Sequence, residues 1–256
     1  MVYALTRPVS HKLAQGELTF LARQPLDPAL AHAQQQTYCE WLRHQGVSVL
    51  ELPAAAALPD AVFVEDAAIV LDEIAVITRP GAASRRPECA SVAAALEAFH
   101  PLAFIRAPGT LEGGDVLRIG HTLYVGLTTR TNAAGIGQLR AAVAPLGYQV
   151  QPVTVSGCLH LKTACTWLGA QTLLSNQHWV DVRAFTGFNI LEVPASEPFA
   201  ANTLTVSDTC LLPASFPRTR ALLAESGYQV QTLDISELQK AEAGLTCLSI
   251  LFTANQ

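Results

Sequence analysis

Residues 111–126 read LEGGDVLRIGHTLYVG, and this stretch decides the fold prediction. A polar residue, Glu112, precedes an apolar run over residues 116–119, which turns at Gly120-His121 and returns as a second apolar run. Two short apolar runs joined by a glycine-containing turn predict a β-hairpin. Similar segments, each opening with a polar residue, occupy residues 59–81, 159–174 and 201–213.

The polar residues that open these segments are evenly spaced. Asp60, Glu112, His160, Asn202 and Cys247 follow one another at steps of 52, 48, 42 and 45 residues. A near-constant step of this size indicates a repeated structural module. We therefore expect a ring in which residues distant in the sequence meet near one axis.

The stretches between the hairpins complete the predicted module. Apolar residues recur there with a spacing near 3.6, which predicts helices over residues 89–99, 133–144 and 217–225. Further strand-like runs follow at residues 148–153 and 228–233. The predicted fold is α/β, a five-bladed α/β propeller of ββαβ repeats with pseudo-fivefold symmetry.

The fifth unit of this ring needs both ends of the chain. It would combine a strand around Cys247 with the N-terminal strand over residues 2–6, so that the first and last strands close the propeller. The alternative is an ordinary open α/β sheet whose hairpins resemble one another by chance.

Composition narrows the classes of partner and compartment. Half of the 256 residues are hydrophobic, 14% are charged, and the net charge of −5 comes without a basic run, which argues against nucleic acid or an anionic membrane as a partner. The N-terminus lacks a signal-peptide pattern, so we expect a cytoplasmic protein with free thiols. We expect one catalytic domain over residues 1–256, and a homodimer is one option for its assembly.

Cys247 and His160 are the natural pair of nucleophile and base. Cys247 lies within residues 244–252, which otherwise read as a buried apolar strand. A thiol attacks well only when its pKa is lowered by a neighbouring cation, and an imidazole can move the protons of such a reaction. Core packing is the alternative for the cysteine, and a structural hydrogen bond is the alternative for the histidine.

The carboxylates indicate a cationic substrate. Asp60, Glu65 and Asp66 cluster in one strand-like segment, whose alternation would place Asp60 and Asp66 on one face and Glu65 on the other. Together with Glu112 they could converge on a planar guanidinium, whose N–H fork matches carboxylate oxygens. A solvated turn is the alternative for Asp60.

Arginines follow two of the returning strands. Arg85 comes shortly after Gly81, and Arg130 precedes Thr131-Asn132. An arginine at the mouth of a site suits the carboxylate of a bound amino acid. The alternative for each is a solvated surface position.

Taken together, these segments closely resemble the dimethylarginine dimethylaminohydrolase family. The resemblance lies in DAVFVED (60–66), TRPGAASRR (78–86), TLEGGD (110–115), RTN (130–132), LHLK (159–162), AAN (200–202) and LTCLS (245–249), in order and at matching separations. It implies a five-bladed α/β propeller of the pentein type. It also implies hydrolysis of Nω-methylated arginine to citrulline and a methylamine through a covalent S-alkylthiouronium on the cysteine, with no metal or other cofactor.

The resemblance further implies roles for individual residues. Cys247 is the nucleophile, His160 the general acid and base, and Glu112 and Asp66 hold the guanidinium. The remaining implied contacts of the substrate are with the side chains of Asp60 and Glu65, with Arg85 and Arg130 at its α-carboxylate, and with the main-chain carbonyls of Leu18 and Ala241 at its α-amino group.

Two departures from the family pattern concern the substrate's surroundings. Residues 241–244 read AEAG where an apolar residue followed by Asp-Gly is expected, and residues 16–20 match the family's lid loosely. An arginine-deiminase-like hydrolase with another guanidino substrate is therefore one alternative. A non-catalytic guanidine-binding protein is the other, although a sensor needs no nucleophile.

Overall fold

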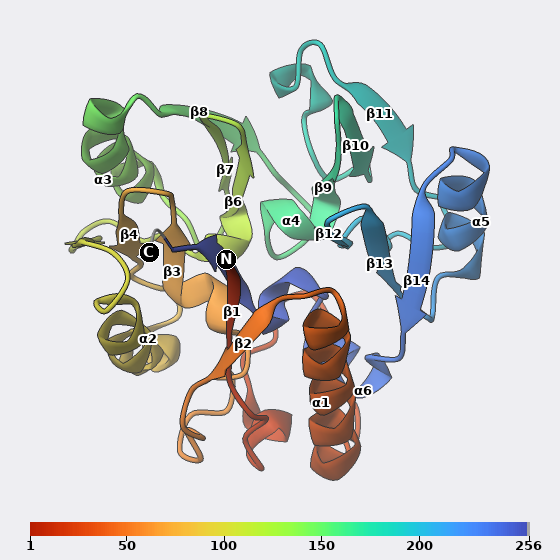
Figure 1. Ribbon diagram of the computed structural model, residues 1–256, viewed down its shortest axis with the longest axis horizontal. Helices are drawn as coiled ribbons and strands as arrows, with labels where there is room; N and C mark the ends of the chain where they lie inside the picture. Colours follow the sequence, from red (N-terminus) through yellow and green to blue (C-terminus); the bar gives the residue numbers. More distant parts are fainter. Residues whose placement is uncertain (255–256) are drawn as a thin grey trace.

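In the computed structural model, which describes residues 1–254, five three-stranded sheets are arranged around a common axis (Figure 1). Every sheet has the same topology, because its first two strands are antiparallel and its third strand runs parallel to the middle one. The predicted five-bladed α/β propeller is confirmed.

The blade that follows Glu112 shows how sequence produces the unit. It consists, in order, of β6 (Val116–Ile119), β7 (Thr122–Leu127), α3 (Ala133–Val143) and β8 (Gln149–Thr154). Gly120 turns between β6 and β7 at φ +58°, a conformation that suits glycine. The Asn132 side chain caps α3 by accepting from the Gly135 N–H at 2.8 Å. Leu123 and Leu139 are fully buried in the core between sheet and helix.

Three further blades follow the same order. They comprise β3 (Ala68–Val70), β4 (Ala75–Ile77), α2 (Cys89–Leu96) and β5 (Leu102–Phe104); β9 (Cys165–Gly169), β10 (Thr172–Ser175) and β11 (Asn189–Glu192); and β12 (Leu204–Val206), β13 (Thr209–Pro213), α5 (Pro217–Glu225) and β14 (Gln229–Leu233). Between β10 and β11 the described chain forms the 3₁₀ turn η6 (Val182–Ala184) instead of an α-helix. This connection has no 3.6-residue period, and its Phe185 packs into the core directly.

The two ends of the chain form the fifth blade. It contains β15 (Ile250–Thr253), β1 (Val2–Thr6) and β2 (Ser48–Glu51), with α1 (Pro28–His44) connecting β1 to β2. Leu5 of β1 pairs with Ile250 on one side and with Leu50 on the other. The predicted closure of the ring by the first and last strands is confirmed.

Two of the predicted site segments form single helical turns ahead of the first strand of their blade, and here the strand predictions were wrong. Asp66 and Glu65 belong to η2 (Val64–Ala67) and Cys247 to η7 (Thr246–Leu248), so strand alternation does not set their directions. Strand pairing in the first blade begins only at Ala68. The backbone N–H groups before Ala68 instead make hydrogen bonds within their own segment: Phe63 N donates to Asp60 O, and Asp66 N donates to Phe63 O.

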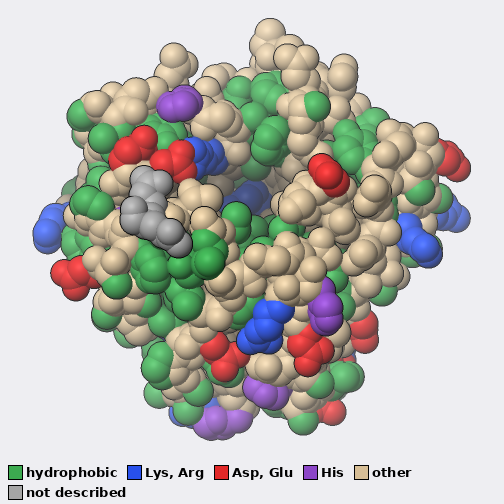
Figure 2. Space-filling view, in the orientation of Figure 1, with side chains coloured by type: hydrophobic (Ala, Val, Ile, Leu, Met, Phe, Trp, Pro, Cys, Tyr) green, Lys and Arg blue, Asp and Glu red, His purple; other side chains and the backbone are tan. Residues whose placement is uncertain are grey.

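The first strands of the blades surround a hollow at the centre of the face in Figure 2. Val70, Leu117, Leu204 and Leu251 line it, and at its inner end lies the ion pair between Lys162 and Glu65. Within residues 1–254, no helix is long and apolar enough to cross a membrane.

Candidate active site

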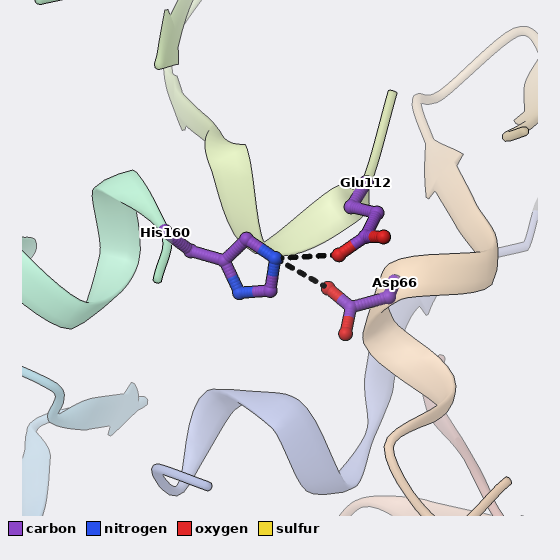
Figure 3. Close-up of side chains that lie close together, drawn as sticks. All are labelled: Asp66, Glu112 and His160. Carbon is purple, nitrogen blue, oxygen red and sulfur yellow. Dashed lines mark hydrogen bonds and ion pairs between the residues drawn. The ribbon is translucent and has the colours of Figure 1, made fainter. Parts of the chain in front are cut away.

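Three blades bring His160, Glu112 and Asp66 into direct contact (Figure 3). His160 precedes α4 (Leu161–Ala164), Glu112 precedes η4 (Gly113–Asp115), and Asp66 lies in η2. His160 Nε2 is 2.7 Å from Glu112 Oε2 and 3.9 Å from Asp66 Oδ1. The exposed fractions of the three residues are 3%, 0% and 2%, so water screens their charges weakly.

The two carboxylates favour a protonated imidazole. Burial alone would lower the pKa of His160, but Asp66, Asp115 and the hydrogen-bonded Glu112 outweigh it and raise that pKa to about 9. Burial alone would raise the pKa of Asp66, but the positive charges of His160 and Arg85 outweigh burial and lower that pKa to about 2. At neutral pH the cluster therefore holds an imidazolium between two carboxylates, and His160 has a proton to give.

Cys247 lies on η7 and lines a cavity together with His160 and Asp66. Its sulfur accepts from the Gly244 N–H at 3.4 Å. Burial, followed by the charges of Glu65 and Asp66, raises the pKa of the thiol to about 12. The cysteine is therefore a neutral thiol at neutral pH.

This cavity gathers most of the predicted site residues. Seven of the ten line it: Asp60, Asp66, Arg85, Arg130, His160, Ala241 and Cys247. Glu112 contacts it through His160. Glu65 lies on the far side of η7, where its carboxylate accepts from Thr246 Oγ1 at 2.8 Å and from Lys162 Nζ. Leu18 is half-buried and lines a smaller neighbouring cavity that shares Ala241.

The two predicted arginine anchors differ in what they already bind. Arg85 donates through Nη1 to Asp66 at 2.6 Å and through Nε and Nη2 to the carboxylate of Glu88 at 3.2 and 2.9 Å. Arg130 Nη1 is buried and makes no hydrogen bond within the described residues, although Glu112 Oε1 lies 3.7 Å away. An unpaired buried guanidinium nitrogen is costly, so Arg130 is the better placed of the two to receive an anion.

The donor atoms of Asp66, Glu112 and His160 lie within 4.8 Å of one another, close enough in principle for a metal ion. A metal would have to take the Nε2 lone pair of His160, which requires a neutral ring. The two carboxylates instead hold that ring as a cation. The donor set therefore fits a protonated imidazole better than a metal centre.

Comparison with known proteins assigns the family. The arginine deiminase family profile matches residues 55–190. A dimethylarginine dimethylaminohydrolase of Streptomyces coelicolor is 44% identical over 250 residues, which cover 96% of this chain and 95% of the relative. One of Pseudomonas aeruginosa is 36% identical over 98% of this chain and 99% of its own length. The chain belongs to the dimethylarginine dimethylaminohydrolase family.

Solved structures of dimethylarginine dimethylaminohydrolases share the propeller. A cysteine-to-serine variant of the Pseudomonas aeruginosa enzyme, complexed with citrulline, has a TM-score of 0.93 at 35% identity and covers 98% of both chains. A dimethylarginine dimethylaminohydrolase adduct with S-methyl-L-thiocitrulline also gives 0.93, at 36% identity over 98% of this chain and 99% of that one. Both structures place a ligand of the arginine and citrulline type on this fold.

Three acidic residues beside this candidate site were not predicted from the sequence. Glu88 pairs with Arg85, and burial raises the pKa of Glu88 to about 7 against the lowering effect of that arginine. Asp115 is fully buried behind His160, and Glu242 bonds to the backbone of residues 19–21. The spacing of Glu88, three residues after Arg85 in a segment that proves helical, was the available signal for one of them.

Proposed function

We propose that this chain hydrolyses Nω-methylated arginine to citrulline and a methylamine. The observation that carries the proposal is the buried imidazolium of His160, held between Glu112 and Asp66 in the cavity that also contains Cys247. A thiol, a proton donor and two carboxylates are the groups that substitution at a guanidinium carbon requires.

Binding comes first in the proposed reaction. The carboxylates of Asp66 and Glu112 fix the guanidinium, and Arg130 takes the α-carboxylate with its unpartnered Nη1. Arg85 keeps Asp66 in place through their ion pair and also supports the α-carboxylate of the substrate. Asp60 and the carbonyls of Leu18 and Ala241 face the amino-acid end, while Glu65 supports η7 through Thr246.

The proposed reaction then has two steps, attack by the cysteine sulfur and hydrolysis of the resulting thiouronium. The bound cation lowers the pKa of Cys247, the thiol releases its proton to solvent water, and the sulfur attacks the guanidinium carbon. The bond from that carbon to the methylated nitrogen breaks, and the departing amine takes the proton of His160. Water next attacks the thiouronium carbon and gives one proton to His160. The carbon–sulfur bond then breaks, the remaining hydroxyl proton passes to the leaving sulfur, and citrulline leaves with its new C=O group.

The test is to incubate the protein with asymmetric dimethylarginine, monomethylarginine and arginine, and to quantify citrulline and the released amine by mass spectrometry. We expect citrulline with dimethylamine or methylamine from the methylated substrates, and none from the Cys247→Ser variant, which retains binding. Ammonia released from arginine as the main product would indicate an arginine deiminase instead. Binding without turnover by the wild-type protein would indicate a non-catalytic guanidine-binding protein.

A further inference from the structure

Glu242 bonds to three successive backbone N–H groups of the N-terminal segment. Thr19 N donates to its Oε2 at 3.0 Å, and the N–H groups of Phe20 and Leu21 donate to its Oε1. A carboxylate that accepts several backbone N–H groups forms strong, charge-assisted hydrogen bonds. Glu242 therefore connects the nucleophile loop to a segment more than 220 residues earlier in the chain.

The backbone of Glu242 is strained. Its φ of +60° lies in the left-handed region, where a glutamate is disfavoured because its Cβ crowds the neighbouring carbonyl oxygen. Residues in such conformations persist where surrounding contacts hold them, and they cluster at functional sites. The side chain of Glu242 is held by its bonds to residues 19–21, and its backbone N–H donates to Gln239 O at 3.1 Å. The residue itself lines the catalytic cavity.

The segment that Glu242 holds is also bonded to the proposed substrate-binding groups. Glu17 N donates to Asp60 Oδ2 at 3.0 Å, and Arg130 Nη2 donates to Thr19 Oγ1 at 3.0 Å. Displacement of residues 17–21 would thus release Asp60 and Arg130 together.

We propose that Glu242 is a latch, meaning that its carboxylate holds residues 17–21 closed beside the cavity and so positions Arg130 and Asp60 for the amino-acid end of the substrate. The identity of that substrate rests on the proposed function. Glu242 is a positioning residue in this arrangement, because it acts through residues 17–21 and not on the reacting carbon.

The Glu242→Gln variant tests the latch by removing the charge and replacing one acceptor oxygen with an NH₂ group, which donates and cannot accept. We expect KM for methylated arginine to rise about tenfold while kcat stays within about twofold, because the reacting groups remain in place. In the substrate-free protein, trypsin should cleave after the exposed Arg23 about tenfold faster, as followed by intact mass. Glu225→Gln, an identical change at an exposed helix end, should alter neither quantity.

A second variant, Glu242→Gly, guards against a folding failure, since glycine suits a φ of +60°. It should reproduce the rise in KM and the faster cleavage. A fall in kcat at unchanged KM would show that Glu242 only shapes the nucleophile loop, and unchanged cleavage after Arg23 would also overturn the latch. If the wild-type protein converts no methylated arginine, the proposed function fails, whereas the trypsin comparison still decides the latch.

Discussion

Cys247 is partly exposed, whereas the other five cysteines are buried. With a pKa of about 12, its thiolate fraction at pH 7.5 is on the order of one in 10⁴ to 10⁵. A neutral thiol of this kind resists adventitious alkylation and oxidation, and in the proposed reaction the bound cation makes it reactive.

The pH dependence of alkylation tests this reading of Cys247. In the substrate-free protein, the rate of iodoacetamide labelling should rise about tenfold per pH unit from pH 7 to pH 10 without reaching a plateau, because the thiolate fraction rises in that proportion below the pKa. Mass spectrometry of the peptide containing Cys247 measures the rate, and Cys247→Ser supplies the background. A plateau below pH 9 would show that the neighbouring charges already stabilise the thiolate.

Among the elements, one buried carboxylate connects the turns that carry three site residues. Asp115 Oδ1 accepts from Leu161 N at 3.0 Å, directly after His160, and its Oδ2 accepts from Thr128 Oγ1 at 2.8 Å. Thr128 Oγ1 accepts in turn from Arg130 N at 3.1 Å. Asp115 also follows Glu112 by three residues. Its carboxylate therefore connects the chain segments that carry His160, Arg130 and Glu112.

Replacing Asp115 with asparagine should therefore impair catalysis in a pH-dependent way. Asparagine keeps one acceptor oxygen, so it loses the hydrogen bond from either Thr128 or Leu161. The pKa of His160 should fall because one of the charges that raise it is gone. We expect kcat/KM to drop about 10- to 100-fold, and its decline at high pH, where His160 loses its proton, to begin at lower pH. Profiles from pH 5 to pH 10 measure both effects, with the exposed Asp208→Asn as the control. An unshifted alkaline limb would contradict the assigned role.

The elements also show what the sequence could and could not predict. Hairpins such as β6 and β7 were predictable because apolar runs and a glycine turn are local signals. The turns η2 and η7, which carry Asp66 and Cys247, were mistaken for strands because three or four residues are too few to show a helical period. The repeat spacing and the residue types singled out Cys247, Glu65 and Asp66, and the resemblance to a family then gave them roles.

At the scale of the molecule, closure of the ring was predictable and the contacts across the cavity were not. Strand patterns at both ends of the chain indicated a shared fifth blade, which β1 and β15 form. By contrast, the bonds of Glu242 to Thr19 and of Thr246 to Glu65 join segments about 180 to 220 residues apart through side chains. No local pattern encodes such contacts, because they depend on how the finished blades meet.

Ring closure makes stability and activity depend on the same blade. Leu5 of β1 is 2% exposed and shares its core with Ile250 of β15, three residues after Cys247. Leu5→Ala should lower the free energy of unfolding by about 2 to 5 kcal/mol through the lost burial and the cavity left behind. Urea titration followed by circular dichroism measures the loss, and citrulline formation should disappear at the same urea concentration because the last strand carries the nucleophile into place.

The matched Leu30→Ala, on an exposed face of α1, should change stability by less than about 0.5 kcal/mol. Activity that persists after the circular dichroism signal of Leu5→Ala has been lost would show that the fifth blade closes independently of the site.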